Sequence, residues 1–208
     1  MQNKFQFLEE LRRIAQLGLA YTQDPWDRER FDRLLELCAV EYEQLDGPPA
    51  LQILDRFHQE LGQVTPKVGL DAAIFDTSGR LLLARRSDDG LWELPGGWAE
   101  LGESVEQGIV RELKEETLLD VAVVQVIDVF SRLPGQYPDQ PHTSCHILFH
   151  CEHTGGQLST SDENLEVGYF LHQHVSAWHR DHGEMAAKAH AYWLARSQSG
   201  PSPNGNSA

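Results

Sequence analysis

The segment from Gly97 to Leu119, GWAELGESVEQGIVRELKEETLL, predicts a helix with two different faces directly after a glycine turn. Residues 104–107 (SVEQ) have the form of a capping box, so a helix is expected to begin at Ser104. Val105, Ile109 and Leu113 then recur every four residues and give this helix one apolar face. The fold must therefore supply a second layer against which that face packs.

Acidic side chains gather on another side of the same helix. Glu112, Glu115 and Glu116 stand at positions i, i+3 and i+4, which brings their carboxylates together. Like charges at this spacing repel, whereas Mg²⁺ or Mn²⁺, which prefer oxygen ligands, would stabilise them. Arg111 lies beside Glu112 and four residues before Glu115, where it can orient a carboxylate. A solvated acidic face is the alternative, but the adjoining turn and apolar face favour a metal site.

The spacing of the charged residues resembles that of a known family. Gly97, Glu103 and the run from Arg111 to Glu116 fill the Nudix box, G-x5-E-x7-R-E-U-x-E-E-x-G-U, where U is aliphatic. This box marks metal-dependent hydrolases of nucleoside diphosphates linked to another group X. Only the last glycine is missing, because Leu118 stands in its place. A left-handed helix end at Leu118 would cost about 1 kcal/mol but would remove no ligand.

The resemblance implies roles for individual residues. The metal ligands would be Glu112, Glu115, Glu116 and the backbone carbonyl of Gly96, with Mg²⁺ or Mn²⁺ as the cofactor. Arg111 and Glu103 would position these ligands. Glu163 and Glu166 are both candidates for a further glutamate that acts as a base or an extra ligand, and each is also compatible with solvated surface.

Aromatic residues near the site are candidates for holding a nucleobase, since stacking is the usual way to bind one. Trp92, Trp98, Phe130 and Tyr137 fall in or near expected loops, and Pro134 lies in the same loop as Tyr137. Each of them is also compatible with ordinary packing. In the N-terminal part, the candidates for substrate walls or partner-subunit contacts are Tyr21, Trp26 and Arg28.

The charge balance excludes one class of partner. The chain has 17 basic and 32 acidic residues, a net charge of −15, and no basic cluster that would hold duplex nucleic acid. A strongly acidic protein that acts on a pyrophosphate needs local positive charge, which bound metal ions would supply. No apolar run is long enough to span a membrane, and no secretory signal is visible, so we expect a cytoplasmic protein.

The cysteines and histidines point to no second metal site. Three cysteines, with no export signal, are typical of reduced thiols. A group of possible zinc ligands occurs between residues 142 and 151: His142, Cys145, His146, His150 and Cys151. Their spacing matches no standard zinc pattern, and residues 144–151 (SCHILFHC) alternate as a strand does.

The order of expected elements sets the fold class. Residues 1–65 show three helical patterns, with Asp24 and Pro25 beginning the second and residues 46–49 (DGPP) ending it. Strands are expected at 68–75 and 80–85, as a hairpin, and at 120–131, 143–151 and 167–171, with a helix at 184–196. Residues 197–208 are expected to be disordered.

We therefore expect an α/β (α+β) fold: a Nudix-type α/β/α sandwich with a mixed sheet in residues 66–196, preceded by a small all-helical domain in residues 1–65. The N-terminal helices and the LPGG turn also resemble a bacterial Nudix subgroup of ADP-ribose and CDP-choline pyrophosphatases. That subgroup implies a homodimer formed through the helical domain. The remaining alternatives are a nucleoside triphosphate or RNA-end hydrolase and a non-catalytic module that senses a nucleotide ligand.

Overall fold

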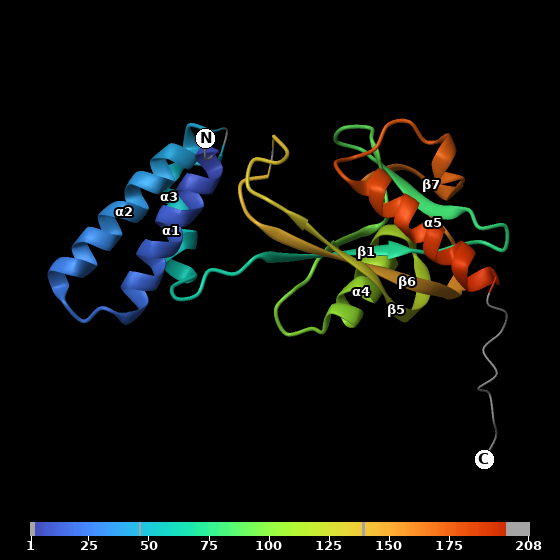
Figure 1. Cartoon of the computed structure of the whole chain (residues 1–208), viewed down its shortest axis with the longest axis horizontal. Helices are drawn as coiled ribbons and strands as arrows, with labels where there is room; N and C mark the ends of the chain where they lie inside the picture. The colour runs from blue at the N-terminus through green and yellow to red at the C-terminus, as the bar shows by residue number, and fades with distance from the viewer. Residues whose placement is uncertain (1–2, 46, 139, 199–208) are drawn as a thin grey trace, which may run out of the picture. The chain divides into compact units, whose positions relative to one another are not determined.

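The computed structural model describes residues 3–45, 47–138 and 140–198. The chain forms two compact units: one contains residues 1–67 and 131–144, and the other contains residues 68–130 and 145–208 (Figure 1). We call them the helical unit and the sheet unit.

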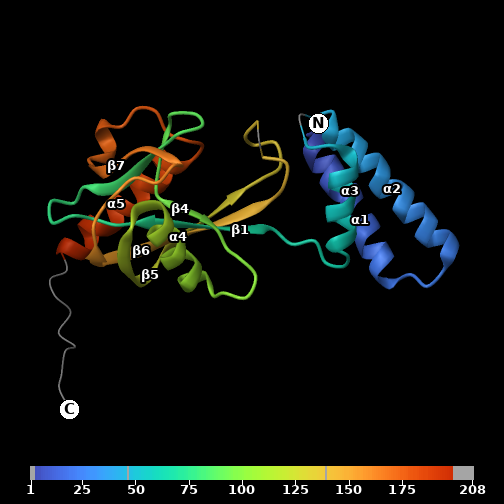
Figure 2. The ribbon, with the colours of Figure 1, turned by 180° about the vertical axis from the view of Figure 1, so that it is seen from behind.

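The helical unit is built from α1 (Lys4–Tyr21), α2 (Pro25–Glu43) and α3 (Ala50–Gln59), which are seen together in Figure 2. Asp24 caps α2 and Pro25 takes its first position, as expected from the sequence. The side-chain amide of Gln16 donates to the carbonyl oxygens of Phe57 (2.7 Å) and Glu60 (3.1 Å) and ties α1 to the end of α3. One apolar core joins the three helices: Leu8, Ala15, Leu19, Leu35, Cys38, Ala39, Tyr42, Ile53 and Phe57.

Residues 131–144 belong to this helical unit although they follow the Nudix box, which ends at Leu119, in sequence. The Asn3 side chain donates to the Pro134 carbonyl oxygen (3.1 Å), and His142 Nδ1 lies 3.0 Å from Glu9 Oε1. The helical unit therefore includes a segment that no helical periodicity identifies.

The sheet unit contains two sheets. The first has the strand order β4-β1-β6-β5 and the second β3-β2-β7. The bounds are β1 Lys67–Ala73, β2 Leu81–Arg86, β3 Trp92–Glu93, β4 Gly96–Trp98, β5 Leu119–Arg132, β6 Ser144–Gly156 and β7 Asn164–Phe170. A short helix, η1, covers His172–His174. The pairs β1–β4, β2–β3 and β2–β7 are antiparallel.

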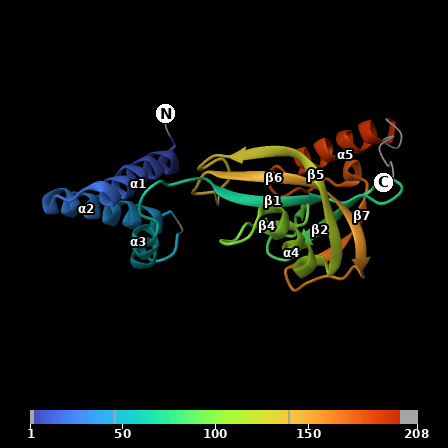
Figure 3. The same cartoon turned by 90° about the horizontal axis from the view of Figure 1, so that it is seen from below.

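Two helices cover opposite faces of these strands, as Figure 3 shows for α4 (Val105–Thr117) and α5 (His182–Gln198). On one face Ile109 and Leu113 of α4 pack with Leu70, Ala72, Ile74, Leu82, Phe149 and Cys151. On the other face Met185, Ala186 and Ala189 of α5 pack with Ala73, Leu81, Leu83, Leu94 and Leu148. Alternate residues of one strand thus face different helices. This arrangement confirms the expected α/β/α sandwich preceded by helices.

Several local expectations can be compared with the structure. The turn at residues 76–79 does reverse the chain, with a bridge between Phe75 and Leu81, but β1 and β2 continue into different sheets. The expected strand alternation of residues 144–151 is present in β6. Helix α5 includes Ser197 and Gln198, which the sequence analysis placed in a disordered tail, and the remaining residues of that expected tail, 199–208, lie outside the described residues. Asp46, expected in the break before α3, also lies outside them.

Candidate active site

The glycine turn before α4 brings backbone and carboxylate into direct contact. Gly96 pairs with Asp71 of β1, and a Cβ at Gly96 would overlap the Leu70 carbonyl oxygen. A Cβ at Gly97 would overlap the carboxylate of Glu112. Gly96 therefore requires glycine, because its Cβ would meet backbone atoms, whereas a Cβ at Gly97 would displace the end of the Glu112 side chain. The Gly96 N–H donates to Glu116 Oε2 (2.9 Å), which holds the helix against the turn.

Carboxylates from three parts of the sheet unit line one cavity of about 670 Å³. The charged residues around it are Arg86, Asp88, Glu93, Glu100, Glu112, Glu116, Asp162 and Glu163. The remaining lining residues are Ser87, Gly96, Gly97, Trp98 and Asn164. A cavity of this volume accommodates a small organic ligand. Its walls contain far more negative than positive charge.

Burial makes the negative charge in this cavity costly. It raises the pKa of Glu116 from 4.5 to about 8, although the bond from the Gly96 N–H lowers it in part. Burial also raises the pKa of Glu112 and takes that of Glu93 to about 7. The carboxylates of Glu93, Glu112 and Glu163 add to the shift of Glu116 by repulsion. A cation at this place would remove much of the cost.

Arg111 is surrounded by acidic partners at the rim of the cavity. It donates to both Glu103 oxygens (2.9 and 3.1 Å), to Glu112 Oε1 (3.0 Å) and to Glu115 Oε2 (3.3 Å). Its Nη2 also donates to the Trp98 carbonyl oxygen (3.2 Å). Hydrogen bonds from Arg111 lower the pKa of Glu103. One guanidinium thus links the glycine loop, Glu103 and the carboxylate face of α4.

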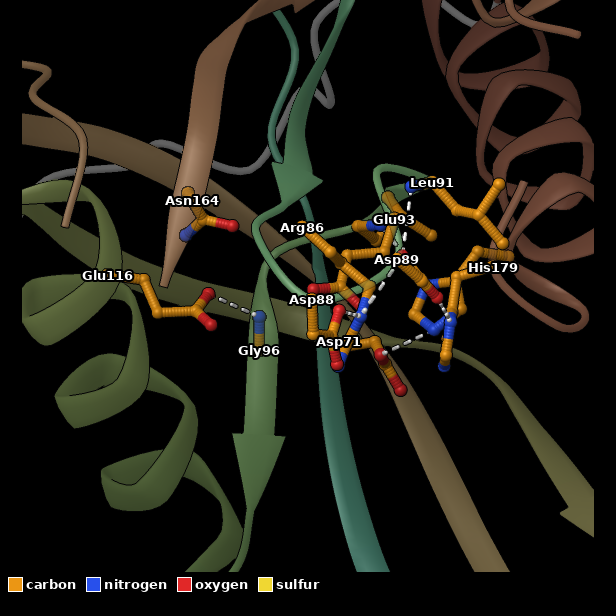
Figure 4. A network of polar contacts seen from close by, with 12 residues as sticks. Asp71, Arg86, Asp88, Asp89, Leu91, Glu93, Gly96, Glu116, Asn164 and His179 are labelled. Carbon is orange, nitrogen blue, oxygen red and sulfur yellow. Dashed lines mark hydrogen bonds and ion pairs between the residues drawn. The ribbon is translucent and has the colours of Figure 1, made fainter. Parts of the chain in front are cut away.

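Arg86 is a functional candidate that the sequence analysis missed. It is the one lysine or arginine among the described residues that line the cavity. Its Nε and Nη2 donate to the two Asp88 oxygens (2.9 and 2.5 Å), and its Nη1 donates to Glu93 Oε2 (2.9 Å); the three residues are labelled in Figure 4. These bonds, that to Asp88 first, raise its pKa, so Arg86 carries a fixed positive charge. Arg86 lies at the end of β2, eleven residues before the first glycine of the Nudix box, and no motif marks it.

A buried polar network supports the turn from behind. The Leu94 N–H donates to His182 Nδ1 (3.1 Å), and His182 Nε2 lies 3.9 Å from Asp71 Oδ1. His146 Nδ1 lies 2.9 Å from Asp71 Oδ2. Since Asp71 pairs with Gly96, this network fixes the segment that carries the glycines. His146 therefore has a structural partner, as does His150, whose Nδ1 lies 3.0 Å from the Tyr192 hydroxyl.

Only some of the expected catalytic residues line the cavity. Glu112, Glu116, Glu163 and Gly96 all line the cavity. Glu115 does not, because its exposed side chain bonds to Arg111 outside the cavity. Glu166 lies on β7 opposite Arg85, exposed and away from the cavity lining. Of the two downstream glutamates, the structure thus brings only Glu163 to the carboxylates of α4.

The aromatic candidates divide in the same way. Trp98 lines the cavity and is about half exposed, with 48% of its surface accessible. Phe130 and Trp92 instead pack at the edge of the core beneath α5. Tyr21, Arg28, Tyr137 and Pro134 belong to the helical unit, where Tyr21 is exposed and Arg28 donates to the Leu19 carbonyl oxygen (3.4 Å).

The oxygen atoms of the cavity are suitable ligands for a hard divalent cation, although they are not arranged as a coordination shell. Within the described ranges, no three His, Cys, Asp or Glu side chains converge as metal ligands do. Among the described residues that line the cavity, the atoms that could bind a metal are nevertheless all oxygens. Burial also raises the pKa of both Glu112 and Glu116. Carboxylate oxygens are the ligands that Mg²⁺ and Mn²⁺ prefer. The chemistry of the donor set therefore fits these ions.

In the described part of the chain, no helix is both long enough and apolar enough to cross a membrane.

The chain matches two known domain families. Residues 65–193 match the model of the NUDIX domain, and residues 4–53 match a domain described as "UDP-X-like, N-terminal oligomerisation domain". The chain is 34% identical over 162 residues to "Putative ADP-ribose pyrophosphatase YjhB" of Bacillus subtilis (strain 168), covering 78% of this chain and 77% of that one.

Solved structures show the same architecture. An ADP-ribose pyrophosphatase from Streptococcus suis 89-1591 is 29% identical with a TM-score of 0.52, over 62% of this chain and 92% of that one. The crystal structure of a UDP-X diphosphatase has a TM-score of 0.57 at 22% identity, over 91% of this chain and 93% of that one. The latter match shows that its fold is shared, the N-terminal helices included.

Proposed function

Because this chain belongs to the Nudix family and is a hydrolase of that family, we propose that it cleaves the pyrophosphate bond of a nucleoside diphosphate linked to a group X. ADP-ribose and CDP-choline are the model substrates. The products would be a nucleoside monophosphate and phosphorylated X. One observation carries the proposal: a single cavity contains Glu112, Glu116 and Glu163 together with the guanidinium of Arg86.

The charges of this cavity match a pyrophosphate only with added cations. Arg86 offers one positive charge against several carboxylates, so an anionic substrate would otherwise be repelled. We infer that Mg²⁺ or Mn²⁺ is held by Glu112, Glu115, Glu116 and the carbonyl oxygen of Gly96. Glu115 would have to leave Arg111 to join them. When bound, such ions polarise a phosphate and lower the pKa of a water ligand.

The chain's own residues would then divide the remaining work. Arg86 binds a phosphate oxygen through the Nη N–H groups that its bonds to Asp88 and Glu93 leave unused. Glu163 accepts the proton of the attacking water, since it lies in the same cavity as Glu112 and Glu116. Arg111 and Glu103 hold the loop and the helix in register, and Trp98 offers a ring for the base.

We propose that the helical unit forms a homodimer interface. Phe7, Ile14 and Tyr21 of α1 are 51%, 44% and 74% exposed and recur every seven residues, which places them along one side of the helix. Exposed apolar side chains aligned in this way favour association, and the matched domain is described as an oligomerisation domain. Ile14→Lys is expected to give a monomer by light scattering; a dimer of unchanged stability would count against this surface.

The test of the activity is product identification by chromatography. The protein is incubated with Mg²⁺ or Mn²⁺ and with ADP-ribose, CDP-choline, a UDP-sugar, NADH, diadenosine polyphosphates, nucleoside triphosphates or a short RNA. We expect AMP and ribose 5-phosphate from ADP-ribose, or CMP and phosphocholine from CDP-choline. Glu116→Gln is the matched control, because the amide has nearly the same shape and lacks the charge.

The other outcomes are equally informative. Turnover of triphosphates or RNA ends alone would replace the proposed substrate class by the alternative hydrolase. Equal activity of Glu116→Gln and the wild type would contradict the assignment of Glu116 as a ligand. Binding of a nucleotide with no turnover under either metal would favour a sensing module. A cytoplasmic location stays a prediction of the sequence.

A further inference from the structure

The helical unit contains a second cavity, of about 310 Å³, whose lining residues all belong to that unit. The apolar part of the wall consists of Phe5, Tyr42, Leu45, Pro48, Ile53, Phe57, Pro138 and Pro141. Helices α1, α2 and α3 and the segment 131–144 all contribute to it. The volume lies at the small end of cavities that hold organic molecules. None of its described lining residues lines the carboxylate cavity of the sheet unit.

Its polar residues are mainly basic, against the trend of the chain. Among the described residues, Arg12, Arg56 and Lys67 line the cavity together with His142 and one acidic residue, Glu60. In the whole chain, acidic residues outnumber basic ones by 32 to 17. A basic lining in so acidic a protein indicates a site for an anion.

The most informative of these residues is Arg12, because it is buried and incompletely bonded. Only 4% of its surface is accessible. Its Nε lies 3.1 Å from Glu9 Oε1 but has no hydrogen-bond partner of acceptable geometry, and its Nη1 lies 3.6 Å from Glu60 Oε2. A guanidinium has five N–H donors, and leaving buried donors unused is costly. Arg12 therefore has donors to spare beside the cavity.

The Glu9 carboxylate, which would repel an anion, is already bound by neighbouring side chains and does not line the cavity. It accepts a hydrogen bond from the Tyr42 hydroxyl (2.8 Å) and one from Arg12 Nη2 (3.3 Å), and His142 Nδ1 lies 3.0 Å from it. Glu9 is not among the lining residues. Its negative charge thus fixes Arg12 from behind without facing the cavity.

The aromatic side chains of the cavity wall indicate that a ligand would also contain a flat ring. The Arg12 guanidinium lies over the Phe57 ring, 5.2 Å from its centroid, and Tyr42 meets the same ring edge-on at 6.0 Å. A flat ring entering the cavity would contact these aromatic surfaces while its charged group reached the basic residues.

We propose that this cavity binds a small organic anion with a flat ring, about the size of a nucleoside monophosphate. Its anionic group binds Arg12, Arg56 and Lys67, and its ring packs on Phe57 and Tyr42. This site is separate from the carboxylate cavity of the sheet unit, and it does not depend on which substrate that cavity cleaves.

The test is isothermal titration calorimetry on the full-length Glu116→Gln variant in EDTA, which excludes turnover. The probes are AMP, CMP, UMP and indole-3-acetate, with ribose 5-phosphate as the anion without a flat ring and adenosine as the ring without an anion. We expect saturable binding of at least one complete probe. Either partial probe is expected to bind at least about tenfold more weakly, the equivalent of one lost charge-assisted or ring contact.

Variants assign the binding to the helical unit. The pair Arg56→Ala and Lys67→Ala, both exposed and therefore tolerant of truncation, is expected to weaken binding at least about tenfold. The matched control is the pair Arg30→Ala and Arg33→Ala on α2, exposed cations that do not line the cavity. It is expected to leave the affinity unchanged.

Three results would overturn the proposal. The first is no binding heat with any of the four complete probes, and the second is an equal loss of affinity in the cavity pair and in the control pair. The third is a loss of affinity only in Arg86→Ala, which would place the ligand in the sheet unit. A chain that lacks hydrolase activity but binds through Arg56 and Lys67 would still support the site, so the two proposals fail separately.

Discussion

Glu116→Gln should act in opposite directions on stability and on catalysis. Glu116 is 8% exposed and accepts a hydrogen bond from the Gly96 N–H, which a glutamine oxygen can also accept. The substitution therefore keeps the contact between α4 and the turn. What it removes is a buried carboxyl group whose ionisation is unfavourable beside Glu93, Glu112 and Glu163.

The size of the effect follows from the pKa of Glu116, which burial raises from 4.5 to about 8. An acid whose pKa is higher in the folded state destabilises the fold as pH rises. The penalty is absent below 4.5, grows by about 1.4 kcal/mol per pH unit, and is constant above the folded pKa. At pH 7 the wild type therefore carries about 3 kcal/mol of penalty that glutamine avoids. At pH 5 the difference is below about 1 kcal/mol.

The assay is urea unfolding in EDTA at pH 5 and pH 7, followed by tryptophan fluorescence. Four of the five tryptophans, at 92, 98, 178 and 193, lie in the sheet unit. The control is Glu106→Gln, the same change at an exposed position of α4, with an expected effect below about 0.5 kcal/mol. A Glu116→Gln variant no more stable than the wild type at pH 7, or a gain that does not change with pH, would refute this reasoning.

Three further substitutions test single features. Leu118 ends α4 with φ 59° and ψ 11° and is half exposed, so Leu118→Gly should stabilise the protein by about 0.5–1 kcal/mol in urea unfolding, whereas Leu118→Ala should not. Gly97→Ala would push the Glu112 carboxylate aside and should lower kcat about a hundredfold in the chromatographic assay, and near-normal turnover would contradict the packing argument. Phe149 is 1% exposed between the strands and α4, so Phe149→Ala should lower the free energy of unfolding by about 3–5 kcal/mol in the same assay. A decrease of less than about 1 kcal/mol would show that the core there is loosely packed.

Features that depend on neighbouring residues could be predicted from the sequence. The capping box is one: Ser104 accepts from the Gln107 N–H (3.2 Å), and the Gln107 side chain accepts from the Ser104 N–H (2.9 Å). The capping box could be predicted because both of its hydrogen bonds lie within one turn of helix. The end of α4 could not, because Leu118 replaces the glycine of the box, and the structure shows that Leu118 adopts the left-handed conformation, with φ 59°, despite its Cβ.

Features that depend on strand pairing could not be predicted in this way. Arg86 reaches the cavity because β2 pairs with β7, whose first residue, Asn164, follows Glu163. The same pairing separates Glu163 from Glu166, which the sequence left as equal candidates. Phe130 stands near the expected substrate loop in sequence, yet its ring packs beneath α5. Periodicity shows which face of an element is apolar, but not which distant element covers it.

The assignment of residues 131–144 to the helical unit has a consequence for how such a chain can be rearranged. The polypeptide passes between the two compact units near residues 67, 130 and 144. A recombination event that moved residues 1–67 to another gene would leave behind the loop that Asn3 and Glu9 hold. Conversely, after a single proteolytic nick near residue 67, the helices would still contact residues 131–144 through Asn3 and Glu9. The complete helical unit is therefore transferred or deleted only together with residues 131–144, which lie where β5 ends and β6 begins.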